Sequence, residues 1–165
     1  MKSLLIGCGN ARTKHLGEAT EWGDLVTLDI DPSTGCDIVH DLDDLPYPLA
    51  DNDFDEVHAY EVLEHCGRQG DWRFFFGQFS EFHRILKPGG RFYGTCPSTK
   101  SPWLWGDPGH TRAITGECLN FLPQQMYEQV GKTACTDYRH VWKGDFKIEG
   151  LTDDGTTLMF CLRAA

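Results

Sequence analysis

The chain has 165 residues, 24% of them charged, and a formal net charge of −10. This length suits a single domain, residues 1–165, that is large enough to bury a core. The acidic balance argues against a surface that grips a nucleic-acid backbone, and no apolar run approaches the ~20 residues of a membrane span.

The chain opens with an apolar segment that leads into two glycines. We predict a strand over residues 3–8, in which Leu4-Leu5-Ile6 is followed by the turn Gly7-Cys8-Gly9-Asn10. Glycine lacks the Cβ atom that would hold a ligand away from the backbone. A loop of this kind can therefore approach a ligand closely, although an ordinary strand-to-helix turn has the same appearance.

A short helix over 11–21 and a second strand over 25–30 come next. The second strand contains Asp29, twenty residues after Gly9. A carboxylate has lone pairs for several donors, so it can accept hydrogen bonds from both hydroxyls of a ribose. Two glycines at the end of one strand and an acid at the end of the next form the nucleoside-binding layout of a doubly wound sheet.

The remaining segments alternate strands with helical patterns. Turn residues and periodic apolar residues predict strands over 36–39, 54–60 and 91–96 and helices over 71–86 and 116–131. They also predict a loop over 97–115 and a terminal hairpin of 146–151 with 157–163. This order predicts an α/β, doubly wound, Rossmann-like fold in three layers. Its sheet would be mostly parallel, with a C-terminal antiparallel hairpin.

The glycine spacing separates the candidate nucleotides. A dinucleotide fingerprint needs a third glycine, and Arg12 stands at that position. No Gly-Lys-Ser/Thr triplet follows, so a Walker loop is excluded as well. A nucleoside ligand without phosphates fits the shortened loop, and S-adenosylmethionine is the usual one. A nicotinamide oxidoreductase is disfavoured.

Charge and cysteines bear on surface and compartment. Residues 15–67 contain fifteen acidic residues and neither Lys nor Arg. A solvated surface explains this better than an acidic shell around a cationic cofactor. The seven cysteines are odd in number and form no C-x-x-C pair, so we expect free thiols and a cytoplasmic location. We expect no metal, because His65 and Cys66 have no second ligand pair at the usual spacing.

The combination of motifs resembles the class I S-adenosylmethionine-dependent methyltransferase family. The resemblance covers about residues 3–97 and is closest to the small branch that lacks the helix between strands two and three. The motifs that carry it are Leu4–Asn10, Val26–Pro32, Ile38–Leu42, Leu45–Pro48, Phe54–Val57, Val62–His65 and Ile85–Gly90. Leu5 and Arg12 depart from the family pattern, which often has an acid before the loop and a third glycine after it.

The resemblance implies S-adenosylmethionine as cofactor and a set of cofactor-binding residues. The loop residues would lie beside the methionine moiety, Asp29 would hold the ribose, and Tyr60 with Glu61 would flank the methionine end. The full set is Gly7, Cys8, Gly9, Asn10, Asp29, Ile30, Asp41, Leu42, Tyr60 and Glu61. Ile30, Asp41 and Leu42 belong to the adenine side.

The loop at 98–115 follows the fifth strand and is the place where we expect the acceptor. Lys100, Trp103, Trp105 and Arg112 are predicted to bind it, and His110 is the candidate general base. The plain alternative is a lid that only packs. For His65 beside Glu64, packing or capping is favoured over catalysis.

We therefore predict methyl transfer to a small-molecule or glycan-like acceptor. A non-catalytic subunit that binds S-adenosylmethionine or a nucleoside beside a partner is the first alternative. Methylation of a nucleotide or nucleic-acid base is the second. Tyr60-Glu61-Val62-Leu63 stands where amino-methylating DNA enzymes carry Asp/Asn-Pro-Pro-Tyr/Phe, which makes nucleic acid the weaker acceptor.

Overall fold

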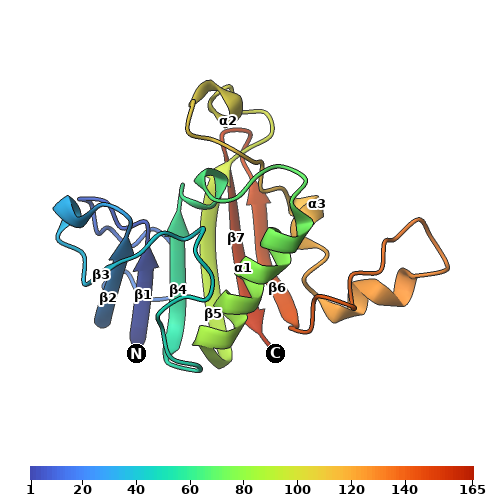
Figure 1. Cartoon of the computed structure of the whole chain (residues 1–165), viewed down its shortest axis with the longest axis horizontal. Helices are drawn as coiled ribbons and strands as arrows, with labels where there is room; N and C mark the ends of the chain where they lie inside the picture. The colour runs from blue at the N-terminus through green and yellow to red at the C-terminus, as the bar shows by residue number, and fades with distance from the viewer.

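A single seven-stranded sheet forms the centre of the molecule (Figure 1). The computed structural model describes all 165 residues. The strand order is β3-β2-β1-β4-β5-β7-β6, and β7 runs antiparallel to both of its neighbours. The strands are β1 (Lys2–Ile6), β2 (Asp24–Asp29), β3 (Ile38–Val39), β4 (Phe54–Tyr60), β5 (Leu86–Pro97), β6 (Phe146–Asp153) and β7 (Thr157–Ala164). The predicted fold class, with its C-terminal hairpin, is confirmed.

The strand order reverses between β1 and β4. Ile6, the last residue of β1, pairs with Leu28 of β2 on one side and Ala59 of β4 on the other. The carboxyl ends of these three parallel strands therefore meet at one edge, where open α/β sheets bind their ligands. Both termini lie at the bottom of Figure 1, while the short helix α2 (Trp103–Gly106) stands at the top.

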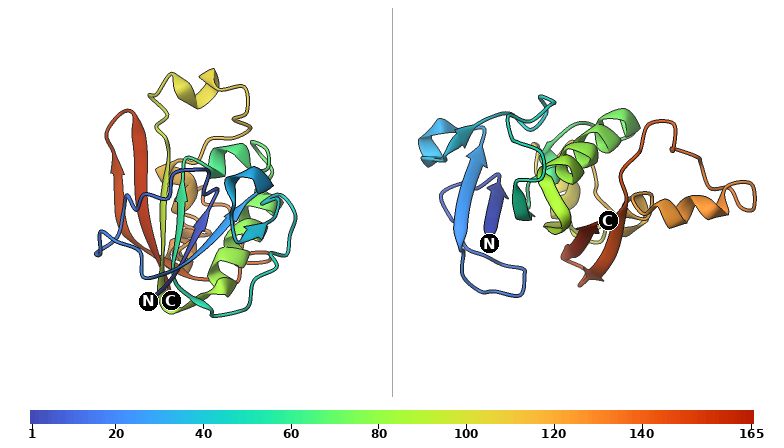
Figure 2. Two further views of the ribbon diagram at one scale, coloured as in Figure 1. Left: turned by 90° about the vertical axis from the view of Figure 1, so that its left-hand side faces the viewer. Right: turned by 90° about the horizontal axis from the view of Figure 1, so that it is seen from below.

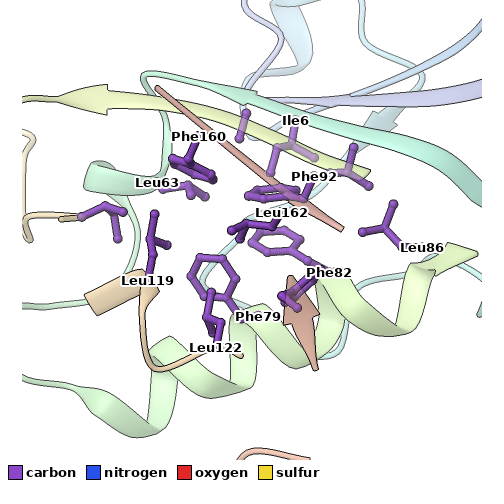
Figure 3. Close-up of a cluster of buried hydrophobic side chains, with 14 of the residues drawn as sticks. Ile6, Leu63, Phe79, Phe82, Leu86, Phe92, Leu119, Leu122, Phe160 and Leu162 are labelled. Atoms are coloured by element: carbon purple, nitrogen blue, oxygen red, sulfur yellow. The ribbon is translucent and has the colours of Figure 1, made fainter. Parts of the chain in front are cut away.

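Helix α1 (Trp72–Ile85) crosses one face of the sheet and contributes Phe76, Phe79, Phe82 and Ile85 to the core. Asp71 caps it by accepting a hydrogen bond from the Phe74 N–H. The apolar stripe predicted from the sequence faces the sheet (Figure 3), and each buried Phe contributes roughly 1.5–3 kcal/mol. The packed residues include Phe79 and Phe82 of the helix and Ile6, Phe92, Phe160 and Leu162 of the strands.

The helix predicted over 116–131 is wrong in its extent. The structure has a short helix α3 (Gly116–Leu119) and a separate 3₁₀ helix η3 (Gln124–Gln129). Pro123 lies between them, and its ring removes the N–H that a continuous helix would need. The Trp142 indole is buried and donates to the Leu122 carbonyl at 2.8 Å, so this segment is held by specific contacts.

The helix predicted over 11–21 does not form, and a coil takes its place. Gly17 has φ +113°, which a helix cannot accommodate, and Leu16 is the segment's one large aliphatic residue. The Tyr60 hydroxyl accepts hydrogen bonds from the backbone N–H groups of His15 (3.3 Å) and Leu16 (3.1 Å). Figure 2 shows α1 on one face of the sheet; the third layer at β1 and β4 is this coil.

Smaller differences concern element boundaries. The third strand is shorter than the predicted 36–39, and a 3₁₀ helix η1 (Pro32–Thr34) precedes it. β5 begins before the predicted 91–96, because Leu86 already pairs with Phe54 and residues 87–90 form a bulge. A further 3₁₀ helix η2 (Leu63–His65) follows β4. None of the helices has the length and apolar character needed to cross a membrane.

Candidate functional site

The glycine loop leaves β1 in two left-handed steps. Gly7 has φ 60° and Gly9 has φ 50°, conformations that side chains rarely adopt. A Cβ on Gly7 would lie 2.4 Å from Cγ2 of Val62, so this glycine permits close packing. A Cβ on Gly9 would meet no atom within 4 Å, so the backbone there faces open space. Cys8 between them is buried, and Asn10 is exposed.

Asp29 lies at the end of β2, next to this loop. One carboxylate oxygen accepts the Gly9 N–H at 2.8 Å, and the other accepts the Asp31 N–H at 2.9 Å. These bonds hold the glycine loop and the start of η1 in place. A carboxylate has about four lone-pair sites, so two remain for further donors. Asp29 as a whole is 9% exposed.

The predicted adenine side offers an apolar surface and a free donor. Ile30 is a large aliphatic residue with 62% of its surface exposed, directly after Asp29. Asp41 is exposed and accepts a hydrogen bond from Asp43 N–H at 2.9 Å. The Leu42 side chain is buried, and its backbone N–H has no partner within the chain.

The two residues predicted at the methionine end point in different directions. Tyr60 turns toward the coil, where its hydroxyl also contacts Nδ1 of His58 at 2.7 Å, and burial raises the pKa of this phenol. Glu61 is exposed and has φ 52°, a backbone conformation uncommon for a non-glycine residue. Desolvation raises the pKa of its carboxyl group. Tyr60 therefore contacts the coil of residues 11–21, whereas Glu61 does not.

A buried acid beside two histidines is the feature that sequence reasoning missed. Glu64 of η2 is 0% exposed, and burial raises its pKa to about 7. Its Oε1 lies 3.9 Å from Nε2 of His110, and the rings of His110 and His65 meet edge-on with centroids 4.5 Å apart. The Glu-His pair in the sequence was a signal, but nothing local indicated that His110 joins it.

The acceptor loop separates into an exposed part and a buried part. Lys100 is exposed, and Trp103 and Trp105 of α2 have 67% and 60% of their surfaces exposed. Arg112 is 3% exposed and donates to the Leu63 carbonyl at 2.8 Å and to the Gln78 side chain. Its guanidinium therefore ties the loop to the core. Its Nη1 has no partner within the chain and the residue lines a cavity, so the predicted role of Arg112 in acceptor binding stays a prediction.

An aromatic cavity lies beside the amino end of α1. Its volume is about 270 Å³, and its walls are mainly aromatic, with Trp72, Phe75, Phe76, Phe121 and Tyr138. Arg112, which belongs to the same loop as His110, also lines this cavity. The glycine loop and Asp29 are not part of this cavity. A ligand bound at that loop would therefore lie outside this cavity.

Comparison with known proteins identifies a family. Residues 4–94 match the model described as methyltransferase domain. These residues include the glycine loop, Asp29 and the buried Glu64, and they end within β5. No curated protein matches the chain.

Solved structures share the fold at low identity. A SAM dependent methyltransferase from Archaeoglobus fulgidus has a TM-score of 0.61 and 15% identity, with 98% of this chain and 85% of that chain covered. The Haloferax volcanii complex between the Trm112 methyltransferase activator and a methyltransferase has a TM-score of 0.57 and 18% identity, with 99% of this chain and 82% of that chain covered. N-methyltransferase NodS from Bradyrhizobium japonicum in complex with S-adenosyl-l-homocysteine has a TM-score of 0.56 and 13% identity, with 99% of this chain and 77% of that chain covered.

Proposed function

The chain belongs to the methyltransferase domain family, and on this premise we propose that it transfers the methyl group of S-adenosylmethionine to a small-molecule or glycan-like acceptor. The cofactor supplies an electrophilic methyl carbon on a positively charged sulfur. The protein binds it and aligns the acceptor with it. Alignment at near-attack distance is worth several kcal/mol in a displacement of this kind.

The hydrogen bond between Gly9 and Asp29 is the observation that supports this function most directly. It brings the exposed backbone of the loop and the carboxylate within 2.8 Å of one another at the carboxyl edge. Two carboxylate lone-pair sites suit the two ribose hydroxyls. The exposed Ile30 side chain suits one face of the adenine, and the unpartnered N–H of Leu42 suits a ring nitrogen. These donors and surfaces fit a nucleoside and include no phosphate cradle.

The acceptor would lie between this edge and the loop at 98–115. Trp103 and Trp105 offer exposed aromatic surface, and Lys100 offers a positive charge. His110 is the candidate base, because its Nδ1 bonds the Leu104 carbonyl and must carry the proton there. Its Nε2 then has a lone pair for an acceptor proton. An aromatic wall with one cation fits a small hydroxylated or amino acceptor.

The second form of the proposal is that the chain needs a partner subunit for methyl transfer. The Haloferax volcanii complex joins a methyltransferase to the Trm112 activator. In this chain the exposed pair Trp103 and Trp105 provides an apolar surface on α2 that a partner could cover instead of an acceptor. The chain would then bind S-adenosylmethionine by itself and transfer the methyl group only with the partner present.

Turnover to S-adenosylhomocysteine against a panel of small hydroxylated and amino acceptors tests the function. Each acceptor is assayed with the chain alone and with candidate partner proteins. Trp105→Ala should raise KM for the true acceptor about tenfold, from a loss of roughly 1.4 kcal/mol of apolar contact, and leave cofactor affinity unchanged. Lys132→Ala, at an exposed position outside the loop, is the control. Calorimetry that detects no S-adenosylmethionine binding would contradict the proposal.

A further inference from the structure

Glu64 is a buried carboxylate without a hydrogen-bond donor. Neither of its oxygens has a partner, although the residue is 0% exposed. The buried Cys96 thiol faces it without completing a hydrogen bond. A carboxylate removed from water is costly unless a cation or a set of donors compensates it. The fold keeps this acid at the end of η2 without any such compensation from its own residues.

Two histidines complete a cluster around this acid. His65 follows Glu64 in η2, and His110 comes from the loop after β5. One potential ligand atom from each of Glu64, His65 and His110 lies within 4.8 Å of the other two. Atoms at such separations can share one ion between them. The cluster lies at the carboxyl edge of β4 and β5.

Hydrogen bonds fix the tautomer of both rings. Nδ1 of His110 contacts the Leu104 carbonyl at 3.0 Å, and Nδ1 of His65 contacts the Gly109 carbonyl at 3.2 Å. A carbonyl can only accept, so both Nδ1 atoms carry the proton. Each Nε2 therefore has a free lone pair. Metal-ligating histidines typically donate their other ring N–H to a carbonyl or carboxylate in this way.

We propose that Glu64, His65 and His110 bind one divalent first-row transition-metal cation. Two imidazoles and a carboxylate form a nitrogen–oxygen donor set without thiolate, which suits such cations. The carboxylate of Glu61 is within electrostatic reach of both histidines, and it could complete the set as a fourth ligand. A bound cation would stabilise the charged carboxylate form of Glu64, which burial alone disfavours. The sequence did not indicate this site because His110 is 45 positions from His65.

Three or four protein ligands leave coordination positions open. An oxygen or nitrogen atom of the acceptor could take one of them, beside the edge where the cofactor binds. This step rests on the proposed function, whereas binding of the cation does not. The role of His110 then changes from a proton acceptor to a ligand.

Titration with Mn²⁺ tests the site in the full chain without cofactor or acceptor. The free Mn²⁺ signal is followed by electron paramagnetic resonance after the protein has been treated with a chelator. Mn²⁺ is chosen because carboxylates suit it and thiolates do not, so the seven free cysteines do not compete for it. We expect one Mn²⁺ per chain. His65→Ala and Glu64→Gln should each weaken binding tenfold or more.

Matched controls separate this site from surface binding. His140→Ala and Glu117→Gln remove an exposed histidine and an exposed acid elsewhere and should leave Mn²⁺ affinity unchanged. The absence of stoichiometric Mn²⁺ binding, or binding that His65→Ala does not weaken, overturns the inference. Should Glu64→Gln fail to fold, His65→Ala decides alone, since its side chain is exposed. Failure here leaves methyl transfer standing, and failure of the turnover assay leaves a cation site standing.

Discussion

Replacement of Asp29 by alanine should weaken cofactor binding by one to two orders of magnitude. In the structure this carboxylate already accepts the N–H groups of Gly9 and Asp31, at 2.8 and 2.9 Å. Its two remaining lone-pair sites would take the ribose hydroxyls. Hydrogen bonds to a charged group are worth about 1.5–3 kcal/mol, which corresponds to a loss of affinity of roughly 10- to 150-fold.

A second variant separates the ribose bonds from loss of volume. Asp29→Asn keeps the shape but places an NH₂ group at one of the two oxygens. Both oxygens accept a backbone N–H, so one N–H would face another donor whichever way the amide turns. We therefore expect Asp29→Asn to bind S-adenosylhomocysteine no better than Asp29→Ala. Asp24→Ala, at the exposed amino end of the same strand, makes the same charge change and is the control.

Isothermal titration calorimetry with S-adenosylhomocysteine measures all three variants. Circular dichroism and thermal unfolding check that each of them folds. The control should bind within about twofold of the unchanged chain, since it lies at the opposite end of β2. A folded Asp29→Ala variant with unchanged affinity would refute the assignment of Asp29 to the ribose.

Three further predictions concern specificity and stability. NAD should bind more weakly than S-adenosylhomocysteine in calorimetry, because Arg12 occupies the position of the third glycine of a dinucleotide fingerprint. Tighter binding of NAD would contradict the assignment of the glycine loop to a nucleoside without phosphates. Arg112→Lys should lower the free energy of unfolding by about 2–4 kcal/mol in urea, since a lysine cannot reach both the Leu63 carbonyl and Gln78. Burial lowers the pKa of His58 to about 4, so the unfolded chain binds the extra proton and stability should fall as the pH drops from 6.5 toward 4; in His58→Gln, urea unfolding should lose this slope.

The strands and the crossover helix were predictable because their signals are local. Mostly apolar runs gave β1 and β2, and polar and apolar residues alternate over residues 56–59 of β4. The apolar stripe of residues 71–86 gave α1 almost to the residue. The two failed helices lacked such support. Residues 11–21 have one large aliphatic side chain, so no apolar face could bury against the sheet. Residues 116–131 contain Pro123, which divides the segment.

The candidate site was predictable only where it follows directly from a strand end. Gly9 lies in the loop after β1, and Asp29 ends the neighbouring parallel strand β2, so the fold alone brings them together. Glu64 and His110 meet because the loop after β5 folds back onto η2, where Thr111 N–H donates to the Glu64 carbonyl at 2.9 Å. No periodicity in the sequence specifies that path. The burial of Arg112 has the same origin, because its partners are Leu63 and Gln78.

The coil over residues 10–23 links the glycine loop to the polar face of the sheet. Lys14 reaches Glu56 at 2.8 Å with only 1% of its side chain exposed. Although burial disfavours the carboxylate, hydrogen bonds from Lys14 and His58 keep the pKa of Glu56 below its usual value. A few polar contacts therefore hold this coil on the sheet, a role that helix packing has elsewhere. Because the coil starts directly after the glycine loop, its order and that of the glycine loop should be coupled.

Tyr60→Phe tests this coupling, since it removes the hydroxyl that accepts the N–H groups of His15 and Leu16. The loss of these bonds should cost about 1–3 kcal/mol and favour local opening of the coil. Trypsin should then cut after Lys14 faster, because its side chain is accessible only in the open form. S-adenosylhomocysteine should slow the cleavage by ordering the adjoining loop. Tyr127→Phe, whose hydroxyl donates to the Phe121 carbonyl at 2.7 Å, is the control. Equal cleavage rates in the two variants would show that Tyr60 does not hold the coil, and cleavage insensitive to the ligand would show that coil and loop order independently.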